Sequence, residues 1–570
     1  MRQKNMPEKK DFPLLPAALF LLALALRIFN LQRFDLQFDE LFSFITVGAR
    51  DLPGLAAGYM NSRPLFIYNL FMSWWQGFGQ GAFFYRLPSA VLGAACVPAV
   101  YLLGREMSGR RTALIAALFT ALSAFHVNFS QEISPYAAAC LLMAVSFYAF
   151  FRWQRTGGRR YLLLNLACNL AGLYLIYYYA MTVILQLCVY LCARKRFNQT
   201  VETPGACPER SRRISPGSFI GETRNCALPV VVFLLLCLPW LFLTALELGR
   251  VITLKNAACG VYSITPYNTQ VSLMSLFYSL TNFSAGYYAP APVRAGSFLI
   301  LSGLFCAGTV CFYKRDRFPG WLVPAAVFAP MLCLFLVSRF ALIYTDRYLF
   351  TGMLFFYIAA ACGLERLFVR AKPAAAALAL CLFVLQAVSL YGYYTDRWTV
   401  PLEKRQGIDT RKSYKAAAAY LYSRFGENDA LLHLSEISTL SFDYYKPPGG
   451  SRGRMVSLPE MIGFIEDYFF TYRTSPKVAL YDIRGHAFHL VLLKGNGRQG
   501  RSGIIFPDRD YPRIWVVHAG WDGSDPGALL CMFDSSAGEN YALEETADFG
   551  GVRIMLYKNR ASISGFTVQR

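Results

Sequence analysis

Residues 84–111 read FYRLPSAVLGAACVPAVYLLGREMSGRR, an apolar run followed at once by a cluster of basic residues. The run from 84 to 103 has about 20 residues, the length that an α-helix needs to cross roughly 30 Å of hydrocarbon. The arginines after it are typical of a loop on the cytoplasmic side of a membrane. The stretch therefore predicts a membrane-spanning helix that ends in the cytoplasm.

The same pattern recurs from residue 13 to residue 392 and then stops. Hydrophobic residues make up 55% of the chain and charged residues 16%, which is unusual for a soluble globular protein. We expect a polytopic α-helical membrane protein with about eleven transmembrane helices. The predicted spans are residues 13–30, 84–103, 112–128, 134–151, 161–177, 178–193, 227–246, 296–313, 319–338, 348–366 and 373–392.

Basic clusters mark alternate connections between these runs, as expected for cytoplasmic loops. They are GREMSGRR, RWQRTGGRR, ARKRF, YKRDRF and ERLFVRAKP. This pattern predicts a cytoplasmic N-terminus, and an odd number of crossings places the chain after residue 395 outside. Membrane topology therefore accounts for the net charge of +21, and we expect no nucleic-acid partner.

Two segments test the count of crossings. The first is residues 64–80, PLFIYNLFMSWWQGFGQ. If this segment crossed the membrane, every later basic loop would lie on the outer side. It predicts an interfacial or re-entrant helix in the first outer loop, with Trp74 and Trp75 at headgroup depth. Residues 161–193 would be about 50 Å long as one helix, too long for a single crossing. We expect them to cross twice around a very short outer turn.

The end of the apolar runs divides the chain into two predicted domains. Residues 1–394 form the transmembrane domain, and residues 395–570 form a small α/β domain outside the cytoplasm. The tail combines a helical stretch, YKAAAAYLYSRF, with three strand-like runs, DALLHL, KVALYDI and RIWVVHA. Most cysteines lie inside apolar runs, where cysteine behaves as a small hydrophobic residue, so we expect no zinc site and no disulfide framework.

Three acids on the predicted outer face are candidate catalytic residues. LQFDELFSF, residues 36–44, places Asp39 and Glu40 side by side after the first span, and HVNFSQEISPY places Glu132 between the third and fourth. A positioned carboxylate can accept the proton of an attacking hydroxyl. The simpler interpretation is that these acids solvate or cap helix ends.

Two arginines and a tyrosine, predicted to lie at the same outer membrane surface, complete the candidate site. Arg63 lies in NSRPLF, and Arg347 and Tyr348 lie in YTDRYLF before the tenth span. An arginine can stabilise the charge that develops on a departing phosphate, although interfacial arginines can also simply bind lipid headgroups. No nucleotide sugar is expected outside the cytoplasm, so a sugar transferase facing outward needs a donor carried by the membrane, such as a polyprenyl phosphate.

The order of these segments resembles the GT-C glycosyltransferases, especially bacterial relatives of the protein O-mannosyltransferases and of the aminoarabinose transferase of lipid A. The segments that carry the resemblance are FDELFSF, RPLFIYNLFMSWWQGFG, FYRLPSAVLGAACVPAVYLLGREMSGRR, HVNFSQEISPYAAACLL and DRYLF.

The resemblance implies a role for each of five residues. Asp39 matches the first-loop acid, a catalytic base or metal ligand, and Glu132 matches the second-loop acid. Arg63 stands where relatives have lysine or histidine before proline, and Arg347 and Tyr348 resemble an Arg-Tyr pair near the donor phosphate. The resemblance requires no cofactor, but it leaves open a divalent metal ion held by Asp39 and Glu132 as the alternative to Asp39 acting as a base.

Our leading hypothesis is an inverting glycosyltransferase in a bacterial inner or plasma membrane. It would move one sugar from a polyprenyl-phosphate donor to a lipid, glycan or protein acceptor on the outer face. A transporter or flippase for lipid-linked glycans is the alternative, and a non-catalytic envelope-assembly protein comes third. Carboxylates or histidines inside the spans would favour a transporter, and the predicted spans are nearly free of them.

Overall fold

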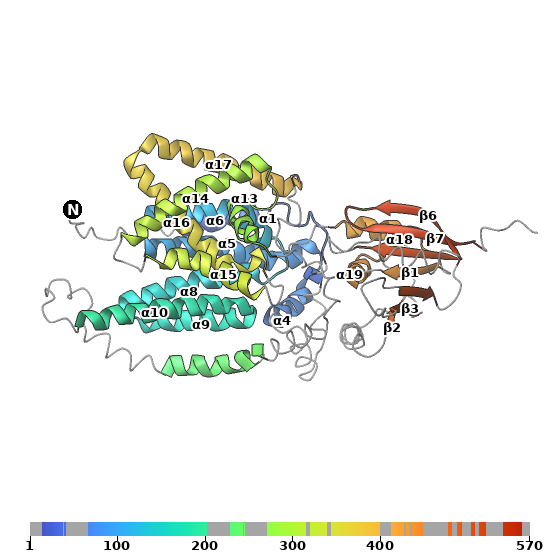
Figure 1. Cartoon of the computed structure of the whole chain (residues 1–570), viewed down its shortest axis with the longest axis horizontal. Coiled ribbons are helices and arrows are strands. Elements are labelled where there is room, and N and C mark those ends of the chain that lie inside the picture. The colour runs from blue at the N-terminus through green and yellow to red at the C-terminus, as the bar shows by residue number, and fades with distance from the viewer. Residues whose placement is uncertain are drawn as a thin grey trace, which may run out of the picture.

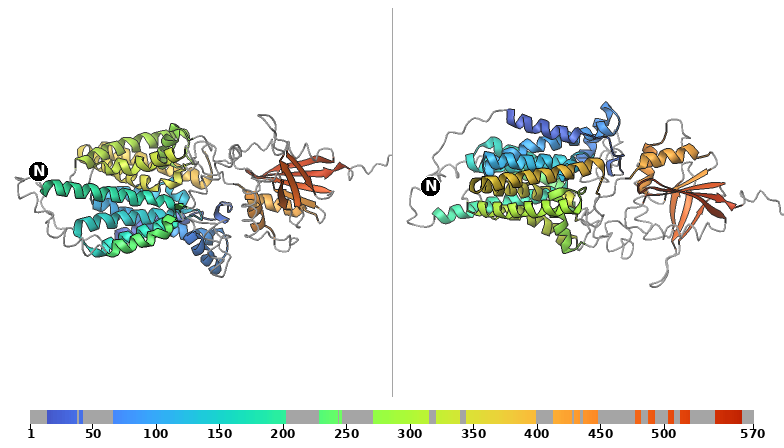
Figure 2. Two further views of the ribbon diagram at one scale, coloured as in Figure 1. Left: turned by 60° about the horizontal axis from the view of Figure 1, so that its bottom comes forward. Right: turned by 90° about the horizontal axis from the view of Figure 1, so that it is seen from above.

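Helices gather at one end of the molecule and strands at the other, as the computed structural model shows (Figure 1). The two further views in Figure 2 separate the same two parts along the long axis. The structure describes residues 14–37, 39–41, 66–201, 228–242, 244–245, 271–314, 320–338, 344–398, 412–426, 429–433, 436–447, 477–481, 487–492, 503–507, 512–519 and 540–560.

The predicted spans coincide with helices. Within the described ranges, five helices are long and apolar enough to cross a membrane, and a sixth crossing results if α6 and α7 form one bent span. A mostly helical membrane fold is thereby confirmed, while the number of eleven crossings stays a prediction. The overlapping helices are α1 (Leu14–Ile28), α5 (Ala82–Met107), α6 (Arg110–Leu122), α7 (Ala124–Ser130), α8 (Tyr136–Thr156), α9 (Arg159–Leu175), α10 (Ala180–Val201), the helix Leu228–Phe242, α14 (Ala291–Tyr313), α15 (Leu322–Val337), α16 (Phe350–Arg370) and α17 (Lys372–Thr395).

The long apolar segment that begins near residue 160 is broken where the sequence predicted a turn. A single 3-10 turn, η3 (Tyr177–Tyr179), separates α9 from α10. Asn165 and Asn169 of α9 both donate to Oε1 of Gln186 in α10, each at 2.9 Å. These bonds join positions on either side of the turn, so the two helices lie side by side (Figure 1).

A bend of 60° separates α6 from α7. The last carbonyl groups of a helix have no partner within it, and here Arg27 of α1 supplies donors. Its guanidinium contacts the carbonyl oxygens of Thr120 at 3.2 Å and Ala121 at 3.4 Å. At the start of α7, the side chain of Ser123 accepts from the backbone N–H of His126. After the bend, α7 ends at Ser130, and Glu132 lies in the turn between α7 and α8.

Helices α14 and α16 touch through their backbones. A Cβ atom on Gly308 would lie 1.8 Å from the carbonyl oxygen of Ala359, and one on Gly363 would lie 2.1 Å from that of Leu304. Small residues allow this close approach, which is common between helices in membranes. The contact holds α16 against α14, and α16 begins three residues after Arg347.

The segment predicted to be interfacial forms α4 (Phe66–Trp75) and the 3-10 turn η2 (Gln76–Phe78). Ten helical residues extend about 15 Å, too short to cross a bilayer. Trp75 stacks on Phe84 with ring centroids 4.7 Å apart and donates its indole N–H to the Phe84 carbonyl at 2.9 Å. Trp74 on the same helix is 59% exposed.

Within its described residues, the tail forms two small sheets and two helices. Its helical stretch and three strand-like runs coincide with α18, β1, β2 and β5. Strand order in the first sheet is β1-β5-β7-β6, with β1 and β5 parallel and the other pairs antiparallel, and the second sheet is antiparallel with order β2-β3-β4. The elements are α18 (Tyr414–Arg424), β1 (Asp429–His433), α19 (Glu436–Tyr444), β2 (Lys477–Tyr481), β3 (Ala487–Leu492), β4 (Gly503–Pro507), β5 (Arg513–His518), β6 (Tyr541–Asp548) and β7 (Arg553–Asn559).

Helix α18 packs against the first sheet, where Trp515 and Val517 of β5 and Leu421 of α18 share one buried cluster. A small sheet region beside the helices is therefore confirmed. The boundary near residue 395 and the placement of this region outside the cytoplasm stay predictions.

Candidate active site

Asp39 and Arg347 are 308 residues apart in the sequence and form an ion pair. Nη1 of Arg347 lies 3.3 Å from Oδ2 of Asp39. Asp39 follows α1 in the chain, and Arg347 lies in the 3-10 turn η5 (Asp346–Tyr348) just before α16. The side chain of Asp39 is 54% exposed and that of Arg347 15% exposed, so the acid faces open space while the cation lies deeper.

Aromatic rings surround the guanidinium of Arg347. Its carbon Cζ lies 5.4 Å from the ring centroid of Tyr136 and 5.8 Å from that of Tyr348. Tyr178 stacks on Tyr348 with centroids 4.3 Å apart. A cation over an aromatic face is attracted by the ring quadrupole. These rings orient Arg347 from α8, η3 and η5, so the three segments meet at one point.

Glu132 lies in the turn between α7 and α8, close to the same region. Its Oε1 accepts from Nδ2 of Asn128 at 2.9 Å. Burial raises the pKa of Tyr287 well above its usual value, the charges of Asp346 and Glu132 raise it further, and the charge of Arg347 opposes them. The charges of Glu132 and Arg347 thus both act on Tyr287, while a shared site for the two residues stays a prediction.

Asp346, directly before Arg347, is a fully buried acid. It accepts hydrogen bonds from Ser279, from Asn282 at 2.7 Å and from Tyr287 at 3.1 Å. The first two donors lie in α13 (Leu273–Ala285), a helix outside the predicted spans. Burial raises the pKa of Asp346 to about 7, although the hydrogen bonds oppose the shift. Asp346 thus ties η5, and with it Arg347, to α13.

Glu40 has surroundings unlike those of Asp39. Arg86 of α5 binds both of its carboxylate oxygens, at 2.8 and 2.7 Å. The backbone N–H groups of Gln37 and Ile133 donate to the same carboxylate at 3.1 and 3.0 Å. Burial alone would raise the pKa of Glu40, but the charge and hydrogen bonds of Arg86 hold it below its usual value. Four donors therefore occupy this carboxylate.

Sequence reasoning did not single out Arg86 or Asp346. The signal for Arg86 was an arginine near the start of an apolar run, since a cation there needs a partner. The signal for Asp346 was an acid beside an arginine in YTDRYLF. Neither pattern identifies the residue that binds the charged side chain, because that residue is far away in the sequence.

Residues 63–207, less than half of the chain, match the family described as dolichyl-phosphate-mannose-protein mannosyltransferase. The structure of ArnT from Cupriavidus metallidurans bound to undecaprenyl phosphate aligns with 95% of this chain and 97% of its own, with 13% sequence identity and a TM-score of 0.50. The resemblance to the GT-C glycosyltransferases is confirmed.

Two more structures of GT-C enzymes show a weaker likeness. ArnT in the apo state aligns over the same shares at 13% identity with a TM-score of 0.48. The arabinofuranosyltransferase AftD from Mycobacteria aligns with 95% of this chain and 41% of its own, at 13% identity and a TM-score of 0.46. At such identities the likeness to ArnT shows the fold alone. No curated protein matches the sequence.

The GT-C family match covers part of the candidate site. It includes Glu132 and the aromatic residues Tyr136 and Tyr178, whereas Asp39 and Arg347 lie outside it. It begins at Arg63, which lies outside the described residues, so the predicted role of Arg63 stays a prediction.

A metal ion on Asp39 and Glu132 is also a prediction that the structure does not test. The two acids are two ligands, and oxygen-binding cations such as Ca²⁺ take six or more oxygens in all. Arg347 already places a positive charge against Asp39. Arg347 can therefore supply the positive charge that a metal ion would otherwise supply there.

Within the described part of the chain, one cluster of three side chains has the spacing of metal ligands: Cys96, His126 and Cys140. Nη2 of Arg27 lies 2.9 Å from Nδ1 of His126. Because arginine only donates, Nδ1 must accept, and the proton of a neutral imidazole then sits on Nε2. Nδ1 then binds Arg27 and Nε2 carries the proton, so neither nitrogen offers a free lone pair to a cation, and we interpret the cluster as helix packing.

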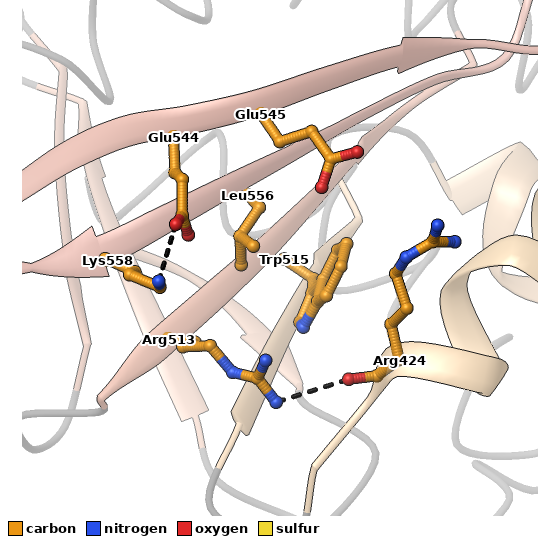
Figure 3. A pocket seen from close by; sticks show the side chains of 7 residues that line it. All are labelled: Arg424, Arg513, Trp515, Glu544, Glu545, Leu556 and Lys558. Carbon is orange, nitrogen blue, oxygen red and sulfur yellow. Dashed lines mark hydrogen bonds and ion pairs between the residues drawn. The ribbon is translucent and has the colours of Figure 1, made fainter.

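A hollow of about 570 Å³ lies on the first sheet of the tail (Figure 3). It is lined by Arg424, Arg513, Trp515, Glu544, Glu545, Leu556 and Lys558. Lys558 is paired with Glu544 at 2.5 Å, Arg513 is paired with Asp429 at 2.8 Å, and Trp515 is 1% exposed. Most of its charges are already neutralised within the sheet, so the region around Asp39 and Arg347 is the stronger candidate.

Proposed function

We propose that this protein is a membrane glycosyltransferase that moves one sugar from a polyprenyl-phosphate donor to an acceptor, with inversion. The observation that supports it best is the contact of 3.3 Å between Asp39 and Arg347, an exposed acid beside a cation held by tyrosines. The structurally similar ArnT is described as bound to undecaprenyl phosphate, a lipid of the class that this reaction releases.

In the proposed reaction, the hydroxyl oxygen of the acceptor attacks the anomeric carbon of the donor sugar. Asp39 takes the hydroxyl proton, and the bond from the anomeric carbon to the phosphate oxygen breaks. The electron pair leaves with that oxygen, so the products are the glycosylated acceptor and the polyprenyl phosphate. Attack and departure on opposite faces of one carbon invert its configuration.

Arg347 has two partners in this scheme at different stages. Before the donor binds, it pairs with Asp39. The donor phosphate then competes for the guanidinium, because paired charge-assisted hydrogen bonds to phosphate are strong. Asp39 is thereby released to accept a proton. As the sugar–phosphate bond breaks, the phosphate gains negative charge, so its attraction to Arg347 strengthens toward the transition state.

The remaining acids have different proposed roles. Glu132, near Tyr287, orients the acceptor hydroxyl. Glu40 has its lone pairs occupied by Arg86 and two backbone donors, so we propose that it holds the loop rather than meeting the substrate. Tyr348 supports Arg347 beside the donor phosphate, and Arg63 is a further candidate for that phosphate.

The proposed setting is a bacterial inner or plasma membrane, with the N-terminus in the cytoplasm and residues 395–570 outside. The acceptor is a lipid, a glycan or a protein at that outer surface. A reporter enzyme fused after residue 395 tests the orientation. It should be active only outside the cytoplasm, and activity inside would contradict the shared outer face of Asp39 and Arg347.

The function is tested by incubating purified protein with a sugar-loaded polyprenyl phosphate and an envelope extract. We expect release of free polyprenyl phosphate together with labelling of the acceptor by the sugar. Movement of an intact lipid-linked sugar across liposomes, without any release, would instead support the flippase alternative.

A further inference from the structure

The tail contacts the loop that carries Asp39 through hydrogen bonds between segments more than 370 residues apart. The side-chain amide of Gln37 makes two of them: it donates to the carbonyl of Lys412 and accepts from the N–H of Lys412, both at 3.1 Å. The hydroxyl of Tyr445 accepts from the backbone N–H of Leu36 at 2.7 Å. Leu36 is fully buried, so this N–H has no access to water.

Asp35 adds a fourth contact at the start of α18. Its Oδ2 accepts from the backbone N–H of Lys415, the second residue of the helix, at 2.9 Å. The first N–H groups of a helix need such acceptors, and a carboxylate also suits the positive end of the helix dipole. Ser413, which stands at the N-cap, makes no capping bond with its own side chain. An acid 380 residues earlier therefore caps α18.

The same loop is held from the helical side by Arg86. Besides Glu40, its guanidinium donates to the carbonyls of Leu31 at 3.1 Å, Phe34 at 2.8 Å and Asp35 at 3.2 Å. The loop thus lies between α5 on one side and the tail on the other. Its backbone is held up to Gln37 and again at Glu40, and Asp39 projects from it toward Arg347.

We propose that Asp35, Gln37 and Tyr445 are positioning residues, through which the tail sets the place of Asp39 relative to Arg347. The proposal deepens the proposed function and rests on it. Asp39 is half exposed and lies between Gln37 and Glu40, whose hydrogen bonds hold the loop, so its position depends on that loop. A shift of about 1 Å in a reacting group can reduce a rate by up to about 100-fold.

The test compares two tyrosines that are neighbours in α19 and directly after it. Tyr445→Phe removes only the hydroxyl that binds Leu36. Tyr444→Phe is the matched control, because Tyr444 is exposed and its hydroxyl makes no hydrogen bond with the described residues. Both variants are made in the full-length protein, and transfer and donor binding are measured with a polyprenyl-phosphate sugar.

For Tyr445→Phe we expect kcat to fall by about 10-fold or more, because Asp39 is displaced. The KM for the donor should stay within twofold, because the aromatic support of Arg347 does not involve the tail. Tyr444→Phe should leave both values unchanged. Wild-type kcat in Tyr445→Phe, or an equal loss in both variants, would overturn the proposal.

Asp35 supplies a second test by conservative rescue. Asparagine can still accept from the N–H of Lys415, whereas alanine cannot. We expect Asp35→Ala to lower kcat and Asp35→Asn to restore most of it. Equal activity of both variants at the wild-type level would contradict a role of the cap in positioning.

Hydrogen exchange separates a failure of this inference from a failure of the proposed function, since it requires no reaction. In Tyr445→Phe the amide hydrogen of Leu36 loses its acceptor and should exchange faster, while Tyr444→Phe should match the wild type. Faster exchange without transfer by any form, wild type included, would refute the transferase function but retain the contact. Unchanged exchange at Leu36 would refute the contact itself.

Discussion

Asp39 and Glu40 are neighbours in the sequence, yet their carboxylates have opposite surroundings. Glu40 is paired with Arg86 at 2.7 Å, and both side chains are almost fully buried. Asp39 is paired with Arg347 at 3.3 Å and is 54% exposed. Breaking a buried pair costs about 3–5 kcal/mol, while an exposed pair contributes about 0–1 kcal/mol. The contrast supports our proposal that Glu40 organises the loop and that Asp39 takes part in the chemistry.

The largest expected effect is on turnover at the exposed pair. Asp39→Asn removes the proposed base, so kcat should fall by about two to four orders of magnitude, the usual value of a positioned base. The melting temperature should stay close to that of the wild type, because little stability depends on an exposed pair. Steady-state kinetics and a thermal melt of the same preparation give both values. Full activity would return Asp39 to a structural role.

The buried pair should show the reverse pattern. Glu40→Gln removes the charged carboxylate that binds the buried guanidinium of Arg86 through both of its oxygens, and we expect a loss of about 3–5 kcal/mol in the free energy of unfolding. A thermal melt in detergent measures this, with Asp39→Asn as the matched control. A melting temperature equal to that of the control would mean that the Glu40–Arg86 pair does not hold the loop.

Arg347 offers a smaller and more selective effect. Lysine keeps the charge of Arg347 but not its planar fork, so Arg347→Lys should lower kcat by about 10-fold while donor affinity changes less. Arg347→Ala should weaken both. Separate measurement of donor binding and single-turnover rate distinguishes the two variants. Unchanged binding and turnover in Arg347→Ala would leave the phosphate to another cation, such as Arg63.

The smallest expected effect concerns the pH dependence of stability. The pKa of Asp346 is raised to about 7 in the folded protein, whereas an unfolded chain titrates near 3.9. Between these values only the unfolded state ionises, so this group loses its stabilising contribution as the pH rises, and the loss is complete above about pH 7. Relative to Asp346→Asn, the wild-type melting temperature should therefore fall by a few degrees from pH 5 to pH 8. If the melting temperatures of the wild type and of Asp346→Asn changed equally with pH, a raised pKa of Asp346 would be contradicted.

Much of the helical part could be predicted from the sequence, because a span is specified locally by its length and lack of charge. The turn between α9 and α10 was predicted in the same way, because residues 161–193 are too long for one crossing. Placing Asp39 and Arg347 on one face depended on the alternation of basic loops, and the structure brings the two into contact.

Other features could not be predicted, because they depend on how distant segments fold back. The partner of Arg86 depends on the path of residues 31–40 over the end of α5. The burial of Asp346 depends on α13, which was not among the predicted spans. The capping of α18 by Asp35 joins two segments 380 residues apart, and no local pattern marks it.

The most direct test of the contrast between the two acids is the turnover per folded molecule of Asp39→Asn and Glu40→Gln, measured side by side below the melting temperature of both. If Asp39 reacts and Glu40 organises, Glu40→Gln should transfer sugar faster than Asp39→Asn, since a displaced loop costs up to about 100-fold whereas the loss of a base costs about two to four orders of magnitude. Equal turnover of the two variants, or a faster Asp39→Asn enzyme, would contradict the account.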